Sequence, residues 1–416
     1  MKILLFAKDL TGIPLALRFI SEGHEVLVWT RENTLAGKGL VDITRDKKKA
    51  LAFKADFTLT DSSGLGHMCD AWPTKVYGGS KLHDTLEFER GISNDLAEAV
   101  GMSVPKRFST KSFEEARRYV KRNKKPVVIK LEGEKYAGST ATFVSKEAEE
   151  AEEVLLAYEK KYPGAEILVQ DKVEGIEIST AGFFNGEKFL PTYYHTLERK
   201  KLLTGDLGPS VGCAGDVVWN TRENWIVKKT LGKLEKALGK LGFQGEIDVN
   251  GIVSGNQVYF LEFTPRFGYN ASLSWFNTLE GGVANFLYDF HLGKATDVPA
   301  KEGFGTSVSV YIPPYPAKHG DTMEKDVPIL HLDDLLWFNP FDLWMKEDGT
   351  LQSAGFGGWI GSPAVFNENL DKGLEENYKR IKEVKIPNLG YRTDIGVNAK
   401  ESLLELFGSI QKIKLS

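Results

Sequence analysis

The sequence has 416 residues, of which 42% are hydrophobic, and its 53 basic and 57 acidic side chains leave a formal charge of −4. A chain of this length divides into more than one hydrophobic core, so two or three domains are expected, and the lack of a long basic tract argues against nucleic acid as the main partner. The two cysteines, Cys69 and Cys213, are far apart and outside any C-x-x-C spacing, which argues against a disulfide framework or a structural zinc site and fits a reducing cytoplasm.

Strands and helices alternate near the N-terminus. The apolar opening is followed at once by Lys8, so it is too short for a secretory segment or a membrane span and is interpreted as a buried strand. Strands are expected at 3–7, 25–29 and near 57–59, with a helix at 14–21, and this alternation indicates a parallel sheet. Ser63 and Gly64 lie in a turn-rich segment after the third strand, where open parallel sheets place their ligand crevices. They are therefore candidate substrate contacts.

A second unit is expected to start near Tyr77. It begins with a helix at 87–100, followed by a helix at 112–122. Ser112 is the expected N-cap of the second helix, and Glu115 occupies the position that completes a capping box.

The rest of the second unit is expected to consist mainly of strands. They are predicted at 127–130, 167–173, 176–184, 245–253 and 257–263, with a charged helix at 146–161. A loop that contains Gly133 and Gly138 follows the first strand, and as part of a hairpin it can close over phosphates. A tight turn at Gly175 is expected to join the next two strands, and residues 254–256 are expected to close a second hairpin.

The chain is accordingly divided into three parts. Residues 1–76 are expected to form an N-terminal substrate-binding α/β domain, and residues 77–293 a central domain with a small lobe at about 108–173. Residues 294–416, which are richer in proline and aromatic side chains, are expected to form a small C-terminal domain. The predicted fold class is a multidomain α/β and α+β protein with a parallel N-terminal sheet.

Two segments of the central part carry groups suited to a nucleotide. Gln170 lies on a strand whose backbone edge can recognise adenine, and Glu177 can accept hydrogen bonds from ribose hydroxyls. An exposed hairpin with surface charges is the alternative interpretation. Lys130 ends a β-branched run, where its ammonium can reach the α- and β-phosphates. A lysine that simply emerges at a strand end is the alternative.

Two carboxylates lie in the apolar strands of the later hairpin. Asp248 and Glu262 are costly to bury there unless something pairs them, and Mg²⁺ held between protein oxygens and substrate phosphates is a suitable partner. A second metal-binding side chain is expected two residues after Glu262, at Thr264. A buried salt bridge from a carboxylate to Arg266 is the alternative, and metal is favoured over it.

The segment D-L-G-P-S-V-G-C-A-G at residues 206–215 is too rich in glycine for a helix or a central strand. It is interpreted as a loop built for close backbone approach, with an ordinary surface loop as the alternative. The basic run at residues 199–201 can steer phosphate groups, although such runs are usually solvated faces.

Together these segments resemble the phosphoribosylamine–glycine ligase family, in the family's order and over most of the chain. G-M-S-V-P at 101–105 resembles its G-I-P-T stretch, V-V-I-K at 127–130 with the two loop glycines resembles K-A-D-G-L-A-A-G-K-G, and E-G-I-E-I-S at 174–179 resembles G-E-E-x-S. Two further family motifs, H-K-R and D-x-G-P-N-T-G-G-M-G, stand in this order in the family. The first resembles R-K-K at 199–201, and the second resembles the segment at 206–215. L-E-F-T-P-R-F-G at 261–268 resembles L-E-F-N-x-R-F-G, and Y-R-T-D-I-G at 391–396 is similar to Y-R-x-D-I-G.

The resemblance implies an ATP-grasp fold in the central domain, a pre-ATP-grasp N-terminal domain, and a set of site residues. The implied catalytic residues are Lys130, Asp206 and Arg266, and the implied ligands of Mg²⁺ or Mn²⁺ are Asp248, Glu262 and Thr264. The implied nucleotide-binding residues are Arg90, Lys130, Gly133, Gly138, Ser139, Gln170, Lys172, Val173 and Glu177. The implied substrate contacts are Ser63, Gly64, Asp206, Gly208, Pro209, Ser210, Gly212, Arg266, Gly268 and Asn270.

Three positions depart from the family's pattern. Residues 8–14, K-D-L-T-G-I-P, stand where the family has the G-x-G-G-R-E-H-A loop thought to meet the ribose phosphate. Thr264 replaces the metal-binding asparagine, whereas Asp248 stands where related amino-acid ligases have a metal-binding aspartate, so Asp248 is expected to compensate. Glu89 and Arg90 replace an S-K pair, and the guanidinium of Arg90 is expected to reach phosphate.

The resemblance implies an ATP-dependent carboxylate–amine ligase that joins glycine to 5-phosphoribosylamine in purine biosynthesis. An acyl phosphate is the implied intermediate, and ADP and phosphate are released. Because the N-terminal loop differs, a ligase that uses another amine acceptor or amino acid is the first alternative, and a nucleotide-binding module without ligase activity is the second. The expected partners are ATP, an amino acid and an amine, with no nucleic acid and no membrane, in a cytoplasmic monomer or homodimer.

Overall fold

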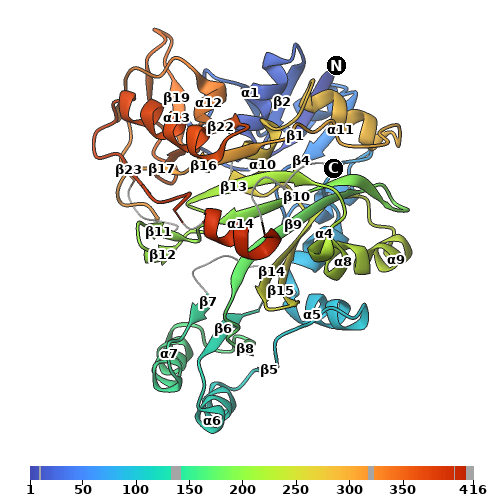
Figure 1. The fold of residues 1–416 in the computed structure, drawn as a ribbon. Helices are drawn as coiled ribbons and strands as arrows, with labels where there is room; N and C mark the ends of the chain where they lie inside the picture. The colour runs from blue at the N-terminus through green and yellow to red at the C-terminus, as the bar shows by residue number, and fades with distance from the viewer. Residues whose placement is uncertain (9–10, 133–141, 317–322, 398, 409–416) are drawn as a thin grey trace.

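The N-terminal part of the chain forms a four-stranded parallel sheet. The computed structural model describes all residues except 9–10, 133–141, 317–322, 398 and 409–416 (Figure 1). The strand order is β3-β2-β1-β4, with bounds β1 (Lys2–Phe6), β2 (Glu25–Trp29), β3 (Asp42–Thr44) and β4 (Phe57–Thr60). The predicted strands correspond to β1, β2 and β4. The analysis missed β3, which is too short for an alternating apolar pattern and is defined by its pairing with β2.

The carboxylate of Glu22 connects this N-terminal unit to a helix that is distant in sequence. Glu22 follows α1 (Ile13–Ser21), and its two carboxylate oxygens accept hydrogen bonds from the backbone N–H groups of Val283 (2.8 Å) and Ala284 (2.9 Å). These groups belong to the first turn of α11 (Val283–His291), where helix N–H donors have no partner within the helix. Glu22 thus caps α11 from more than 250 residues away in sequence.

The predicted helix at 87–100 is wrong in its bounds. The chain forms α4 (Lys81–Phe88) and α5 (Arg90–Ala99), separated at Glu89, whose φ of −94° and ψ of 77° lie outside the helical region. The Ser93 hydroxyl donates to the carbonyl of Leu86 (2.7 Å), so the break leaves that carbonyl paired. The interruption makes Arg90 the first residue of a new helix.

The small lobe is a four-stranded sheet covered by two helices on one face. Its strand order is β5-β8-β6-β7, with bounds β5 (Arg107–Thr110), β8 (Ile167–Asp171), β6 (Val127–Leu131) and β7 (Thr142–Val144). The helices are α6 (Phe113–Asn123) and α7 (Ala148–Lys161), and they pack on Val127, Ile129 and Val169. Because strand side chains alternate between faces, Lys130 and Gln170 lie on the opposite face.

The predicted N-cap of α6 is confirmed, but the capping box is half formed. The Ser112 hydroxyl accepts from the backbone N–H of Glu115 (3.3 Å). The Glu115 carboxylate accepts from the Thr110 hydroxyl (2.6 Å) instead of the Ser112 N–H, which donates to Thr110 Oγ1 (3.0 Å). The preceding strand residue therefore competes successfully for both partners.

The centre of the molecule is a seven-stranded antiparallel sheet. Its order is β15-β14-β9-β10-β13-β16-β22, with bounds β9 (Ile176–Phe184), β10 (Phe189–Glu198), β13 (Gly215–Thr221), β14 (Gly245–Ser254), β15 (Gln257–Thr264), β16 (Phe304–Val308) and β22 (Ala364–Asn367). The predicted β14–β15 hairpin is confirmed, and Gly255 has the positive φ of 57° that its turn requires.

The predicted hairpin through Gly175 is wrong. Strand β8 pairs with β5 and β6 in the small lobe, whereas β9 pairs with β10 and β14 in the large sheet. Residues 172–175 are thus a crossover between the two sheets. Gly175 has a φ of 155°, and a Cβ there would lie 2.0 Å from the carbonyl oxygen of Val253, so the crossover needs glycine.

Part of the segment after residue 293 extends the large sheet. Strand β16 pairs with β13, and β22 pairs with β16, so the sheet crosses the predicted boundary at 293/294, and the domain division stays a prediction. The remaining elements are α2 (Lys47–Ala52), α3 (Gly66–Asp70), β11 (Lys201–Leu203), β12 (Leu207–Ser210), α8 (Trp225–Lys229), α9 (Leu231–Leu241), α10 (Tyr269–Phe276), β17 (Val310–Tyr311), β18 (Pro328–Ile329), α12 (Leu335–Phe338), β19 (Leu343–Met345), β20 (Leu351–Ser353), β21 (Trp359–Gly361), α13 (Leu370–Glu383), β23 (Gly390–Tyr391) and α14 (Ala399–Phe407). None of the helices in the described ranges is long and apolar enough to cross a bilayer.

Replacement of Glu22 by alanine should lower the free energy of unfolding by about 1–3 kcal/mol, because two helix N–H groups lose their acceptor. Denaturant unfolding would measure the change. Glu25→Ala is the matched control, since Glu25 makes only an exposed ion pair with Lys2 (3.6 Å) and should change the stability by less than about 0.5 kcal/mol. Equal effects of the two substitutions would refute the capping role.

Candidate functional site

One face of the large sheet carries an unusual number of polar side chains. Across the β14–β15 pair, Glu262 lies opposite Asn250 and Thr264 lies opposite Asp248. Across the β14–β9 pair, Asn250 lies opposite Ser179. Because alternate residues of a strand point to the same side, all five side chains share one face. The predicted metal ligands Asp248, Glu262 and Thr264 are therefore brought together.

Glu262 pairs with a cation from a separate helix. Its Oε2 atom lies 3.0 Å from Arg90 Nη1, and the side chain of Glu262 is 40% exposed. Burial alone would raise the pKa of Glu262, but the charges of Arg90 and Lys130 lower it to about 2. The alternative of a salt bridge to Arg266 is not what the structure shows, because Arg90 is the partner of Glu262.

Lys130 reaches the large sheet from the small lobe. Its Nζ atom lies 3.5 Å from the carbonyl oxygen of Leu261, the residue before Glu262. Burial and the nearby charge of Arg90 lower the pKa of Lys130 to about 8, and the carboxylates of Glu262 and Glu177 oppose that shift. Lys130, Arg90 and Glu262 come from β6, α5 and β15, so three separate elements meet between the two sheets.

Lys200 joins two further carboxylates to this cluster. Its Nζ atom lies 3.7 Å from Glu177 Oε1 and also contacts Glu198 at the end of β10. Burial lowers the pKa of Lys200, but Glu198 and Glu177 outweigh it and hold the pKa well above its usual value. The sequence analysis missed Glu198, which belongs to no motif and is brought in only by the pairing of β10 with its neighbours.

Two oxygens near Glu262 have no hydrogen-bond partner. They are Asp248 Oδ1 and Asn250 Oδ1, whereas Asn250 Nδ2 donates to Ser179 Oγ (3.1 Å). Burial, with a contribution from Glu198, raises the pKa of Asp248 to about 7. Unpaired buried oxygens are costly, and a hard divalent cation is a partner that would satisfy them.

A cation at this place would need additional oxygens. The described part of the chain holds no group of three or more His, Cys, Asp or Glu side chains that could bind a metal ion by themselves. Magnesium commonly completes its shell with substrate phosphates and water around one or two carboxylates. The residues present therefore fit a cation that arrives with a nucleotide.

The small lobe carries an unsatisfied amide on the same sheet face as Lys130. Gln170 is 1% exposed, and neither its Nε2 nor its Oε1 atom has a partner. In the sheet register Gln170 lies opposite Val128 and Lys130 opposite Leu168, which places Gln170 and Lys130 on one face. Lys172 is paired with Glu174 (2.6 Å) in the crossover that follows. The remaining predicted residues of the phosphate loop, Gly133, Gly138 and Ser139, lie outside the described residues.

The predicted substrate residues Ser63 and Arg266 meet at Glu87. Arg266 Nη2 lies 3.0 Å from Glu87 Oε1, and the Ser63 hydroxyl donates to the same carboxylate. The guanidinium of Arg266 also lies over the ring of Tyr269, 4.4 Å from its centroid. The sequence analysis missed Glu87, because nothing in its local sequence indicates these two distant partners.

The other predicted substrate residues occupy three places. Gly64 donates its backbone N–H to Asp84 Oδ1 (2.6 Å), beside Ser63. Gly268 precedes α10 as its N-cap residue, and Asn270 is fully buried with Nδ2 2.7 Å from Ser309 Oγ. Asp206, Gly208, Pro209 and Ser210 lie on or beside the β11–β12 ribbon, and Gly212 follows it. The predicted loop at 206–215 thus includes a short strand, which forms because residues 201–203 supply its partner.

Asp216 is a buried carboxylate that the sequence analysis missed. It is fully buried, and it accepts hydrogen bonds from the hydroxyls of Ser274 and Ser307, each at 2.5 Å. Burial raises the pKa of Asp216 to about 7, although the two serine hydrogen bonds oppose the shift. In the register Asp216 lies opposite Glu198, so it continues the polar row of the sheet.

These elements have the ATP-grasp fold, in which the small lobe meets the large sheet at Lys130 and Leu261. Residues 89–271 match the family described as phosphoribosylglycinamide synthetase, ATP-grasp (A) domain. A solved phosphoribosylamine–glycine ligase from Thermotoga maritima superposes with a TM-score of 0.77 at 18% identity, over 95% of this chain and 100% of that one. Biotin carboxylase from Campylobacter jejuni superposes with a TM-score of 0.63 at 14% identity, over 99% and 96%.

Over nearly its whole length the chain is similar to phosphoribosylamine–glycine ligases. The protein of that name from Streptococcus pneumoniae strain R6 is 25% identical over 404 residues, which are 94% of this chain and 90% of the relative. The one from Clostridium acetobutylicum is 23% identical over 344 residues, 77% and 78% of the two chains. The predicted resemblance and the predicted ATP-grasp fold are therefore confirmed.

The stability of the protein should depend on the charge of Asp216. Its pKa in the folded chain, about 7, lies above the unfolded value of about 3.9, so the folded state loses stability as the pH rises between these values. We expect the free energy of unfolding of wild type, relative to Asp216→Asn, to fall by up to about 4 kcal/mol between pH 4 and 8. Chemical denaturation across this range would measure it.

Asp42→Asn serves as the control for this experiment, because Asp42 is exposed at the start of β3. Its substitution removes one carboxylate without touching the hydrogen bonds of Asp216. Parallel pH profiles for wild type and Asp216→Asn would contradict the assigned titration.

Proposed function

We propose that this protein is an ATP-dependent carboxylate–amine ligase, which joins glycine to 5-phosphoribosylamine and releases ADP and phosphate. The observation that carries the proposal is the meeting of Lys130, Arg90 and Glu262 between the two sheets, where cations of both lobes face a carboxylate of the large sheet. The names of the relatives from Streptococcus pneumoniae and Clostridium acetobutylicum agree with this activity.

ATP is proposed to lie between the small lobe and the large sheet. Lys130 and Arg90 would neutralise its phosphates, because both cations already lie beside Glu262. The unpartnered amide of Gln170 and the backbone at Lys172 and Val173 would recognise adenine. Glu177, close to Lys200, would accept hydrogen bonds from the ribose hydroxyls. Gly133, Gly138 and Ser139 are proposed to cover the phosphates.

Mg²⁺ or Mn²⁺ is proposed to be held by Glu262, Asp248 and Thr264. The low pKa of Glu262 keeps that carboxylate ionised, and Asp248 Oδ1 has no other partner. When bound, the cation supplies charge neutralisation at the terminal phosphates. The aspartate at 248 would offset the weaker ligand Thr264, which lies directly opposite it on β15.

In the proposed reaction a carboxylate oxygen of glycine attacks the γ-phosphorus of ATP. The bond from that phosphorus to the β–γ bridging oxygen breaks, which gives ADP and an acyl phosphate. The amine of the acceptor then attacks the carbonyl carbon, loses a proton, and expels phosphate to form the amide. Catalysis of the first step depends on positioning and charge stabilisation, and Arg266 is proposed to contact the glycine or acyl-phosphate oxygens.

The acceptor is proposed to lie between the N-terminal sheet and the cleft. Ser63, beside Gly64 after β4, and Arg266 both contact Glu87. The carboxyl end of β4 therefore lies near the proposed glycine contact. The segment after β1 differs from the family's glycine-rich loop, and its Thr11 hydroxyl donates to Asp61 Oδ2 (2.6 Å). This difference favours a second candidate function, in which the same chemistry serves another amine.

Replacement of Glu262 by glutamine should lower the rate of ADP formation at least about 100-fold, because it removes the negative charge from the proposed cation site. A coupled ADP assay with saturating glycine and amine would measure the rate, and circular dichroism would verify the fold. Glu187→Gln, in the exposed turn between β9 and β10, is the control and should keep wild-type turnover. Wild-type turnover in Glu262→Gln would remove Glu262 from the site.

Mass spectrometry should identify the acceptor directly. Purified protein would be incubated with ATP, Mg²⁺, glycine and a panel of amines that includes 5-phosphoribosylamine. The expected product is the glycine amide of 5-phosphoribosylamine, formed with one ADP for each amide. Amide formation with a different amine only would establish the second candidate function, and ATP binding without any amide would indicate a nucleotide-binding module.

A further inference from the structure

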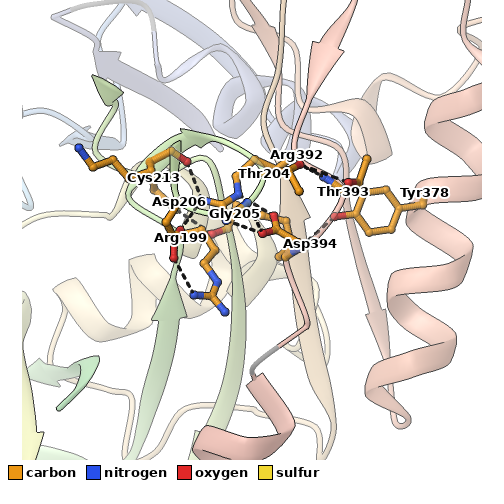
Figure 2. A network of polar contacts seen from close by, with 12 residues as sticks. Arg199, Thr204, Gly205, Asp206, Cys213, Tyr378, Arg392, Thr393 and Asp394 are labelled. Atoms are coloured by element: carbon orange, nitrogen blue, oxygen red, sulfur yellow. Dashed lines mark hydrogen bonds and ion pairs between the residues drawn. The ribbon is translucent and has the colours of Figure 1, made fainter. Parts of the chain in front are cut away.

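Arg392 is a buried arginine that binds two distant segments of the chain. Its side chain is 1% exposed, and its Nε and Nη2 atoms contact the two carboxylate oxygens of Asp394 at 2.8 and 2.7 Å. Its Nη1 atom donates to Asp206 Oδ1 (2.8 Å) and to the carbonyl oxygen of Lys201 (2.7 Å). Figure 2 shows this guanidinium between the C-terminal segment and the β11–β12 ribbon.

Neighbouring residues strengthen the same junction. The backbone N–H of Gly205 donates to Asp394 Oδ2 (3.0 Å), and the backbone N–H of Thr393 donates to Thr204 Oγ1 (3.2 Å). Arg199 lies 3.6 Å from the second carboxylate oxygen of Asp206. Residues 392–394 therefore hold the turn of the ribbon at several points, and two arginines balance two aspartates (Figure 2).

The ribbon is exposed over much of its surface, although Leu202 is buried. Strands β11 and β12 pair only with each other, and Leu203 and Leu207 are 43% and 64% exposed. An isolated two-stranded ribbon is marginally stable in water. Asp206 also has a φ of 55°, in the left-handed region that is unfavourable for a residue with a side chain. The contacts from Arg392 and Asp394 therefore hold the turn of the ribbon, whereas the burial of Leu202 holds its base.

The ribbon in turn determines where Lys200 lies. Lys200 directly precedes β11, its carbonyl accepts from Val211 N (2.9 Å), and its ammonium contacts Glu177 and Glu198. A shift of the ribbon would move this ammonium away from the two carboxylates. It would also move the backbone at residues 208–210, which the resemblance to phosphoribosylamine–glycine ligases implies to be substrate contacts on the amino-acid side of the reaction.

We propose that Arg392 is a positioning residue for the amino-acid half of the reaction. By binding Asp206 and the Lys201 carbonyl, it holds the ribbon and Lys200 against the cleft, while the nucleotide contacts of the small lobe are made without it. This inference rests on the proposed ligase function for its kinetic consequence. Its structural consequence, an ordered ribbon, is independent of that function.

The planar arrangement of N–H donors on the guanidinium explains why an arginine is needed to hold both Asp394 and the ribbon. Arg392 makes two parallel contacts with Asp394 and two further ones with the ribbon. A lysine has a single ammonium and cannot reproduce this planar arrangement. Arg392→Lys should therefore keep the charge but loosen the ribbon.

Limited trypsin digestion tests the structural consequence, because residues 199–201 are three consecutive trypsin sites at the start of the ribbon. Cleavage there should be at least about fivefold faster in Arg392→Lys and Asp206→Asn than in wild type. Asp206 is 54% exposed, so its substitution tests the same contact without risk to a buried core. The increase in the double variant should be smaller than the two single effects combined, because both substitutions disrupt the contact between Arg392 and Asp206.

Steady-state kinetics tests the functional consequence. The KM for the amino acid should rise at least about tenfold in Arg392→Lys, and more than the KM for ATP, because the proposed ribose contact Glu177 is linked to the ribbon only indirectly, through Lys200. Arg380→Gln is the matched control, since Arg380 forms a comparable pair with Asp334 (2.7 Å) in the same C-terminal segment but does not contact the ribbon. It should leave both the KM values and the cleavage at 199–201 unchanged.

Unchanged cleavage in both ribbon variants would overturn the proposal, as would equal changes in the two KM values. Accelerated cleavage with a larger increase in the amino-acid KM than in the KM for ATP would support it. If wild-type protein forms no amide, the ligase proposal fails, and the digestion still decides whether Arg392 holds the ribbon.

Discussion

The neutralisation of carboxylates on one face of the large sheet is the constraint on which the site depends. Register alone places Glu177, Asp248 and Glu262 on this face, together with Glu198 from the neighbouring strand. Such a row is unfavourable unless cations from outside it approach closely. Arg90 comes from α5 and Lys130 from the small lobe, and Lys200 enters through the ribbon. Each cation thus belongs to a different structural unit.

The carboxylates respond differently to this shared environment. Burial raises the pKa values of Asp248 and Glu177, whereas Arg90 and Lys130 lower the pKa of Glu262, which is only partly buried, to about 2. The difference follows from distance, because Glu262 is in direct contact with Arg90 and Asp248 has an unpartnered oxygen. Glu262 is therefore ionised at neutral pH, whereas Asp248 titrates close to neutral pH.

Local patterns were sufficient to predict most of the strands and some residues of the site. Lys130 was recognisable at the end of its β-branched strand, and Asp248 and Glu262 as polar residues in an apolar hairpin. The ion-pair partners of the site residues were not recognisable, because each ion pair forms only when whole elements pack together. These ion pairs are Arg90–Glu262, Glu87–Arg266 and Lys200–Glu198. The same limit explains the errors in the fold. The break at Glu89 and the crossover at Gly175 depend on tertiary contacts that no short segment encodes.

The crossover at residues 172–175 has a mechanical consequence. The small lobe is covalently joined to the rest of the molecule by this segment and by the chain that leads from α5 into β5. Within the lobe, β6 and β8 are paired, so Lys130 and Gln170 must travel together as one body. Because Gly175 fits tightly beside Val253, the pivot of any swing is anchored on the large sheet. A small rotation there would move both the ammonium and the amide relative to Leu261 and Glu262 on the large sheet.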